Sequence, residues 1–237
     1  MQTSIMKEIN TNYILSLYEK YIADLKEARK YQKTLYSQKG YSWFESKILK
    51  KVRLLKNRMT IKPQLDDIEA EITYLLIREY KPKTIVEISP CAGWSTSWIL
   101  NALKDNSGSH LYSYDLIDDS SKMVPPSLSD GSWTFFKCDI RGNLDKLPQK
   151  IDYLFIDSDH SADFAYWYIH NLFPRLEKGV PISVHDVFHK ADPDFDCEGR
   201  VIINWLEQNN IGYSTASPAK EKVVFILTFC KTVRRQH

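Results

Sequence analysis

Apolar residues recur in short runs along the chain, and the run that organises the others is Thr84–Ile88. This stretch is rich in β-branched residues and predicts a buried strand. A turn of mostly small residues follows over Ser89–Gly93, and from Trp94 to Leu100 apolar residues recur at helical spacing. A strand, a tight turn and a helix in this order open a doubly wound α/β fold, in which the ligand binds where the strand ends.

Strand and helix patterns alternate after this unit. Helices are predicted over Ala162–Leu176 and Glu198–Asn209. Further strands are predicted at His110–Asp115, Ser132–Cys138, Ile151–Asp157, Pro181–His185, Ile211–Thr215 and Lys222–Cys230. This order predicts a Rossmann-like, mostly parallel seven-stranded sheet with an antiparallel strand near the C-terminus.

The N-terminal part has helical patterns only. Three helices are predicted, at Asn10–Tyr36, near Trp43–Lys56 and at Pro63–Tyr80. We therefore expect a helical arm or cap over residues 1–60, ahead of a Rossmann-like domain over 61–237. The first helix carries an apolar seam formed by Ile14, Tyr18, Tyr21, Leu25 and Ala28. Such a seam needs an apolar partner, which predicts either a cover for the acceptor side of the site or a homodimer contact.

Charge is unevenly distributed along the chain. Residues 1–60 hold 13 Lys and Arg against 5 Asp and Glu, a net charge of +8, while the remaining residues hold 19 against 25, a net charge of −6. A basic arm suits an anionic partner such as RNA or a membrane surface, and it equally suits a solvated helix face.

No apolar run approaches the ~20 residues of a membrane span, and the N-terminus has no signal-peptide pattern. The four cysteines are scattered without a Cys-x-x-Cys pair, so we expect reduced thiols and a cytoplasmic protein.

The turn after the first strand limits the ligand class. It contains neither a P-loop pattern nor a complete Gly-x-Gly-x-x-Gly pattern. The next strand ends in Asp115, 22 residues beyond Gly93. A carboxylate at that distance can reach the ribose hydroxyls of a nucleoside lying across the first turn, although Asp115 could also serve only as a turn cap.

Five titratable residues follow two other strands, namely Asp157, Asp159, His160, His185 and Asp186. Adjacent parallel strands end at the same sheet edge, so we expect these side chains to meet. They could bind Mg²⁺ or another divalent cation, or supply a general base for a substrate hydroxyl. The alternative is that the acids cap the following segments and the histidines have local partners.

The spacing of Glu87, Ser89, Cys91 and Gly93 resembles the Glu/Asp-x-Gly-x-Gly-x-Gly signature of class I S-adenosylmethionine (SAM)-dependent methyltransferases, with Ser89 and Cys91 in glycine positions. The resemblance implies that Glu87, Ser89 and Gly93 hold the methionine moiety of SAM. It also implies that Asp115 binds the ribose and that Asp139 lies beside the adenine.

The stretches Ile-Asp-Ser-Asp-His-Ser (156–161) and Val-His-Asp (184–186) are similar to the macrocin- and novobiocin-type sugar O-methyltransferases. This resemblance implies O-methylation of a sugar or other small-molecule hydroxyl, with Asp157, Asp159, His160 and His185 as catalytic residues. A divalent cation would be held by Asp157, Asp159 and Asp186. Two alternatives stay open: a nucleic-acid methyltransferase that uses the basic arm, and a Rossmann-like binding module without catalysis.

Overall fold

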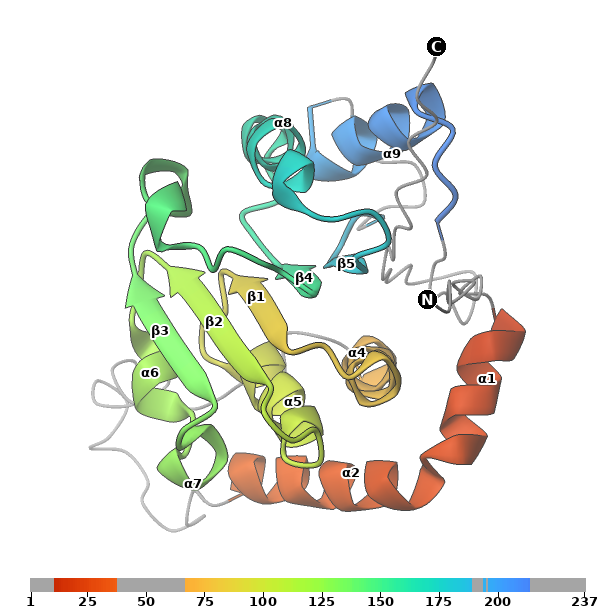
Figure 1. Ribbon diagram of the computed structural model, residues 1–237, viewed down its shortest axis with the longest axis vertical. Helices are drawn as coiled ribbons and strands as arrows, with labels where there is room; N and C mark the ends of the chain where they lie inside the picture. Colours follow the sequence, from red (N-terminus) through yellow and green to blue (C-terminus); the bar gives the residue numbers. More distant parts are fainter. Residues whose placement is uncertain (1–10, 38–66, 189–193, 195, 214–237) are drawn as a thin grey trace, which may run out of the picture.

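A sheet of five parallel strands lies at the centre of the molecule, in the order β3-β2-β1-β4-β5 (Figure 1). The computed structural model describes residues 11–37, 67–188, 194 and 196–213. The strands are β1 (Thr84–Ile88), β2 (His110–Asp115), β3 (Trp133–Lys137), β4 (Tyr153–Ile156) and β5 (Ile182–Val184). The helices are α1 (Thr11–Lys20), α2 (Ile22–Ser37), α4 (Asp67–Tyr80), α5 (Trp94–Leu103), α6 (Asp119–Met123), α7 (Pro126–Ser129), α8 (Ala162–Asn171) and α9 (Glu198–Gln208).

Helices cover both faces of the sheet and form a three-layer structure. On one face, α4 and α5 pack on the strands with α1 and α2 outside them, while α8 and α9 cover the other face (Figure 1). Successive strand residues point to opposite faces. Ile85 and Phe155 accordingly join the core with α4 and α5, whereas Val86 and Leu154 join the core with α8 and α9. Both faces are buried, which explains why the central strands are apolar runs.

The strand order sets the position of the site. β1 lies between β2 and β4, with Glu87 level with Ser113 on one side and with Phe155 on the other. The order of the strands therefore reverses between β1 and β4, and ligands of such sheets bind outside the carboxyl ends at this point.

Five of the seven predicted strands are present in the described residues, and all five are parallel. The expected seven-stranded sheet with an antiparallel strand is therefore not what the structure shows. Residues 211–213 begin the predicted sixth strand, but Ile211 lies in irregular backbone and is held by its amide donating to the Leu206 carbonyl at 3.0 Å. Residues 214–230, which hold the rest of these two strands, lie outside the described residues.

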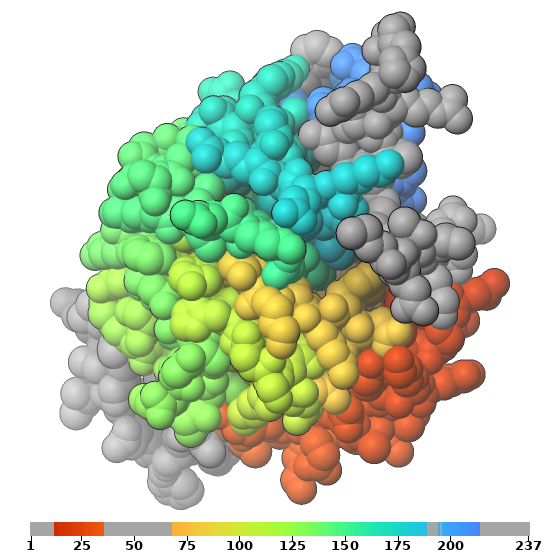
Figure 2. All heavy atoms as spheres, in the orientation of Figure 1, coloured from red at the N-terminus to blue at the C-terminus, as the bar shows by residue number. Residues whose placement is uncertain are grey.

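The N-terminal seam finds its partner inside the same chain. The predicted continuous helix is two helices, broken at Tyr21, and Leu17, Leu25 and Ala28 are buried in the core formed with α4 and α5. Figure 2 shows the atoms of α1 and α2 lying directly against those of α4 and α5. The predicted second helix lies outside the described residues, and the homodimer stays a prediction.

Polar contacts fix α1 and α2 on α4. Tyr18 donates a hydrogen bond to Glu71 at 3.0 Å, and Arg29 forms an ion pair with the same carboxylate. Arg78 pairs with Asp24 at 2.6 Å. On α4 itself, Ile72, Leu75 and Leu76 are buried, whereas Ile68 near its start is exposed. No helix in the described ranges combines the length and the hydropathy that crossing a membrane requires.

We expect Leu25→Ala to lower the free energy of unfolding by about 3 kcal/mol, because it removes buried methyl groups and leaves a cavity between α2 and its neighbours. Leu25 is 2% exposed, whereas Leu15 on α1 is 55% exposed and provides a matched control. Leu15→Ala should change stability by less than about 0.5 kcal/mol. Urea unfolding measures both, and equal losses would contradict the assigned packing.

Candidate functional site

A pocket opens at the carboxyl edge of the sheet. Each of the first four strands contributes to its lining, through Ser89 after β1, Leu116 after β2, Asp139 after β3 and Asp159 after β4. Asp115, the last residue of β2, also lines it. Three of the predicted cofactor residues, Ser89, Asp115 and Asp139, therefore share one wall.

The turn after β1 places non-glycine residues in a backbone conformation that favours glycine. Ser89 has φ +63° and Cys91 has φ +46°, at the two positions where the methyltransferase signature has glycine. A side chain in this region costs about 1–2 kcal/mol per residue. Gly93 has φ +84°, and a Cβ atom there would lie 2.7 Å from Val124 Cγ2. The backbone path of the signature is thus kept, and Gly93 allows α6 to approach the start of α5.

Asp115 is fixed by the backbone around the turn. Its Oδ2 accepts a hydrogen bond from the Cys91 amide at 2.9 Å, and its Oδ1 accepts one from the Ile117 amide at 3.1 Å. Burial raises the pKa of Asp115, and the backbone hydrogen bonds oppose this rise. A carboxylate has about four acceptor positions, so each oxygen can still accept a bond from a ligand hydroxyl.

Asp139 forms a local ion pair with Arg141. Arg141 Nη2 lies 2.8 Å from Asp139 Oδ2, and the backbone amide of Arg141 donates to Oδ1 at 2.9 Å. The side-chain hydrogen bond from Arg141 lowers the pKa of Asp139. Both residues line the pocket, so this wall presents a cation as well as an anion.

Glu87 lies on the other side of β1, away from the pocket. It shares the face of Ile85, is 0% exposed, and accepts hydrogen bonds from Ser95 at 2.6 Å, Thr96 at 2.8 Å and Ser113 at 2.6 Å. Burial raises the pKa of Glu87 to about 7, and the three hydroxyl donors oppose that rise. The side chain anchors the first turn of α5 to β1 and β2, so we assign it the role of holding the turn in place.

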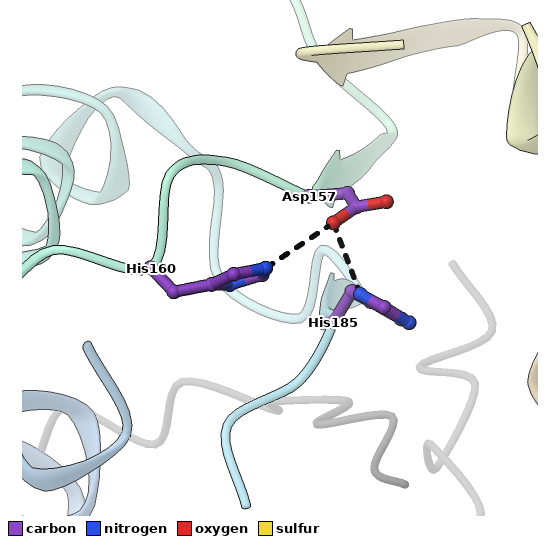
Figure 3. Close-up of side chains that lie close together, drawn as sticks. All are labelled: Asp157, His160 and His185. Carbon is purple, nitrogen blue, oxygen red and sulfur yellow. Dashed lines mark hydrogen bonds and ion pairs between the residues drawn. The ribbon is translucent and has the colours of Figure 1, made fainter. Parts of the chain in front are cut away.

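Four of the five predicted reaction-site residues meet beside the pocket, after β4 and β5, and Figure 3 shows three of them, Asp157, His160 and His185. Asp157 Oδ1 lies 3.0 Å from His185 Nδ1 and 3.8 Å from His160 Nε2. Asp186 Oδ2 lies 3.6 Å from His185 Nδ1 and 3.8 Å from His160 Nε2. We call Asp157, His160, His185 and Asp186 the edge cluster. His160 and Asp186 both have positive φ, at +58° and +54°, and such strained residues concentrate at functional sites.

Asp159 is the one predicted member that lies apart from the edge cluster. Its Oδ1 accepts hydrogen bonds from the Ser161 amide at 3.0 Å and the Ser161 hydroxyl at 2.8 Å, and the side chain is exposed at the pocket. The sequence spacing could not show this, because His160 has a left-handed backbone and the two neighbours point in different directions.

Two glutamates that the sequence reasoning missed complete the cluster. Glu69 of α4 lies 2.9 Å from His185 Nε2, and Glu198 of α9 lies 2.8 Å from His160 Nδ1. Both glutamates are buried, at 0% and 1% exposed. The available signal was an acid beside apolar positions of a helix, since Glu69 lies next to Ala70 and one turn before Ile72, both of which are buried.

The carboxylates favour the charged form of both imidazoles. Burial alone lowers the pKa of His185, but hydrogen bonds to Asp157 and Glu69 outweigh it and raise this pKa to about 11. The pKa of His160 is raised in the same way, by Glu198 against the effect of burial. Four carboxylates thus surround two imidazoles, and either two protons or one divalent cation would offset half of the negative charge.

The comparisons with known proteins concern the domain and the fold. Residues 86–187 match the family model described as a methyltransferase domain. No curated protein sequence matches the chain.

Solved structures share the fold at low sequence identity. The O-methyltransferase TomG from Streptomyces achromogenes, in complex with SAM, is 17% identical with a TM-score of 0.58, over 78% of this chain and 90% of that one. An O-methyltransferase from Bacillus cereus, in complex with SAH, is 17% identical with a TM-score of 0.57, over 84% and 100%. An rRNA methylase from Streptococcus thermophilus is 12% identical with a TM-score of 0.53, over 71% and 98%. The domain match and the fold agree on a Rossmann-like methyltransferase domain, and the macrocin and novobiocin branch stays a prediction.

The Glu87 site predicts a pH-dependent stability. The pKa of Glu87 in the folded protein, about 7, lies above its ordinary value of 4.5. Folding therefore favours the protonated carboxyl, and this contribution is fully present below pH 4.5 and lost as pH rises through about 7. The difference corresponds to about 3 kcal/mol. Glu87→Gln, which stays neutral, should lose much less stability than the wild type between pH 5 and 8 in urea unfolding, and parallel pH profiles would contradict the assignment.

Proposed function

We propose that this SAM-dependent methyltransferase transfers the methyl group to a hydroxyl oxygen of a small molecule. The observation that carries the proposal is the edge cluster directly beside the pocket. Ser158 and Asp159 line the pocket, and the chain neighbours on either side of them, Asp157 and His160, belong to the cluster. A nucleoside bound after β1–β3 would therefore place its transferable group near carboxylates and imidazoles.

The pocket wall suits the nucleoside part of SAM. Asp115 would accept hydrogen bonds from the ribose hydroxyls, and Asp139 would lie beside the adenine, as the resemblance implies. The turn at Ser89–Gly93 carries small side chains and would allow the methionine part to approach the backbone. In this arrangement Ser89 and Gly93 contribute the backbone conformation of the turn, and Glu87 stabilises that turn through its hydrogen bonds on the opposite face of β1.

The chemistry asks little of the protein beyond alignment and removal of one proton. The acceptor oxygen forms a bond to the methyl carbon while the carbon–sulfur bond breaks, and its electron pair stays on sulfur. The hydroxyl proton must leave, and the carboxylates of Asp157 and Asp186 in the edge cluster are the proposed acceptors of this proton. Without a cation, the raised pKa of His185 favours its charged form, which cannot take this proton, whereas a cation bound at Nδ1 would displace the proton from that nitrogen.

The donor set of the edge cluster also fits a divalent cation. One atom each from Asp157, His160 and His185 lie within 4.8 Å of one another, and Asp186 lies beside them. Two imidazoles with carboxylates favour Mn²⁺ or a later transition metal over Mg²⁺. A bound cation would lower the pKa of the acceptor hydroxyl. We therefore replace Asp159 in the predicted cation site by His160 and His185.

Nucleic-acid methylation is the second candidate, favoured by a basic hollow on α2 lined by Lys26, Arg29, Lys30 and Lys33. Such a surface attracts phosphates. Figure 1 shows α2 near the opposite end of the sheet from the carboxyl ends of the strands. In the proposed arrangement the methyl group is transferred at the carboxyl edge of the sheet, where the edge cluster lies and from which α2 is distant, and this favours the small-molecule hydroxyl.

Asp115→Ala should weaken binding of SAM and of S-adenosylhomocysteine by about 1–3 kcal/mol, because the ligand hydroxyls lose a half-buried acceptor. Asp145→Ala, at an exposed aspartate outside the pocket, is the matched control and should bind as the wild type does. Isothermal titration calorimetry measures all three proteins. Wild-type affinity in the Asp115→Ala protein would refute the assigned cofactor pocket.

The cation assignment makes a separate prediction. The metal-free wild type should bind one Mn²⁺, and Asp157→Asn should lower this affinity at least about tenfold because it removes a charged ligand. Asp159→Asn should retain it, because Asp159 faces Ser161 instead. Metal titration by calorimetry, before and after EDTA treatment, tests this. Loss of binding in Asp159→Asn but not in Asp157→Asn would contradict the revised ligand set.

A further inference from the structure

In each imidazole of the edge cluster, one ring nitrogen faces Asp157 and the other faces a glutamate. His185 presents Nδ1 to Asp157 at 3.0 Å and Nε2 to Glu69 at 2.9 Å. His160 presents Nε2 to Asp157 at 3.8 Å and Nδ1 to Glu198 at 2.8 Å. The two rings are therefore arranged alike, each with one nitrogen facing the centre of the cluster and one facing a buried glutamate.

We infer that Glu69 and Glu198 are positioning residues that hold the rings of His185 and His160 with one nitrogen of each facing Asp157. The inference rests on the proposed function for its chemical purpose, since it names what orients the groups of that same site. Neither glutamate touches the pocket, so both act through the histidines.

The burial of the glutamates makes them rigid partners. Glu69 is 0% and Glu198 is 1% exposed, and His185 is 6% exposed. A buried carboxylate without a partner is strongly disfavoured, so each glutamate and its imidazole constrain one another. A carboxylate on the outer nitrogen of a histidine fixes the orientation of the ring.

Helix α9 carries a second set of contacts that hold Glu198. Tyr168 of α8 donates a hydrogen bond to Glu198 Oε1 at 2.9 Å, which leaves Oε2 for His160. The backbone amide of Glu198 donates to the His160 carbonyl at 2.9 Å, and the backbones of Ser161 and Cys197 form an isolated antiparallel β-bridge. The start of α9 is thus fastened to the loop after β4, which fixes the left-handed backbone of His160.

Helix α4 holds Glu69 in a different way. Glu69 lies two residues from Glu71, whose partners Tyr18 and Arg29 belong to α1 and α2. The N-terminal helices therefore brace the same part of α4 that reaches His185. Helices α1 and α2 are therefore connected to the site through α4, on the face of the sheet that α4 covers.

The test compares Glu69→Gln and Glu198→Gln with matched controls on the same helices, Glu79→Gln, which lies at the far end of α4 and pairs with Lys20, and Glu207→Gln. Two-bond proton–nitrogen correlation spectra report the state of each imidazole, with His185 and His160 assigned from the signals lost in His185→Asn and His160→Asn. Glu69→Gln should shift the ring nitrogens of His185, and Glu198→Gln those of His160, whereas neither control should move them. This readout requires no metal, cofactor or acceptor.

Mn²⁺ affinity provides the second readout, with an expected loss of about 10- to 100-fold for Glu69→Gln and Glu198→Gln and none for the controls. Glu69→Asp keeps the charge and shortens the reach, so it should lower the affinity as well. Unchanged His185 and His160 resonances in both glutamine variants would overturn the inference. Binding of S-adenosylhomocysteine by the wild-type protein distinguishes the proposed function from the positioning role. If the wild-type protein does not bind this nucleoside, the proposed function is refuted and the positioning role stays intact.

Discussion

The buried chain Asp157–His185–Glu69 is the interaction on which the site depends. It joins the end of β4, the end of β5 and helix α4 through two contacts of 3.0 and 2.9 Å. Charged groups out of water are stable only in the company of opposite charge, so removing any member would leave the others uncompensated. The chain therefore fixes where β4 and β5 end relative to α4, and the pocket opens beside that point.

A second buried carboxylate supports the other half of the site. Glu87 has no imidazole partner and is held by three hydroxyls, which keep the start of α5 against β1 and β2. The strained turn at Ser89 and Cys91 follows Glu87 directly, so the hydrogen bonds of Glu87 hold the residues that lead into this strained backbone. The half of the site after β1 and β2 thus depends on neutral donors to an acid, and the half after β4 and β5 depends on paired charges.

The fold could be predicted from the sequence because its signals are local. The strand Thr84–Ile88, the turn that ends at Gly93 and the acid Asp115 at the end of β2 can each be recognised from a few neighbouring residues. Parallel strands then bring their carboxyl ends to the same edge of the sheet by topology alone. Partners distant in sequence could not be predicted in this way. Glu69 reaches His185 across more than a hundred residues, and the left-handed backbone at His160 turns Asp159 away from its neighbours. The same limit applies to the N-terminal seam, whose pattern predicts an apolar partner but does not identify α4 and α5.

The central claim is that Asp157, His160 and His185 form one cation site beside the SAM pocket. A crystal structure of the chain grown with Mn²⁺ and S-adenosylhomocysteine, with anomalous scattering collected at the manganese edge, tests it most directly. The account predicts one strong anomalous peak between these three side chains, next to the sulfur of the bound nucleoside product. A nucleoside bound after β1 and β2 with no manganese peak at the edge cluster would contradict the cation site, and a nucleoside bound elsewhere would contradict the pocket itself.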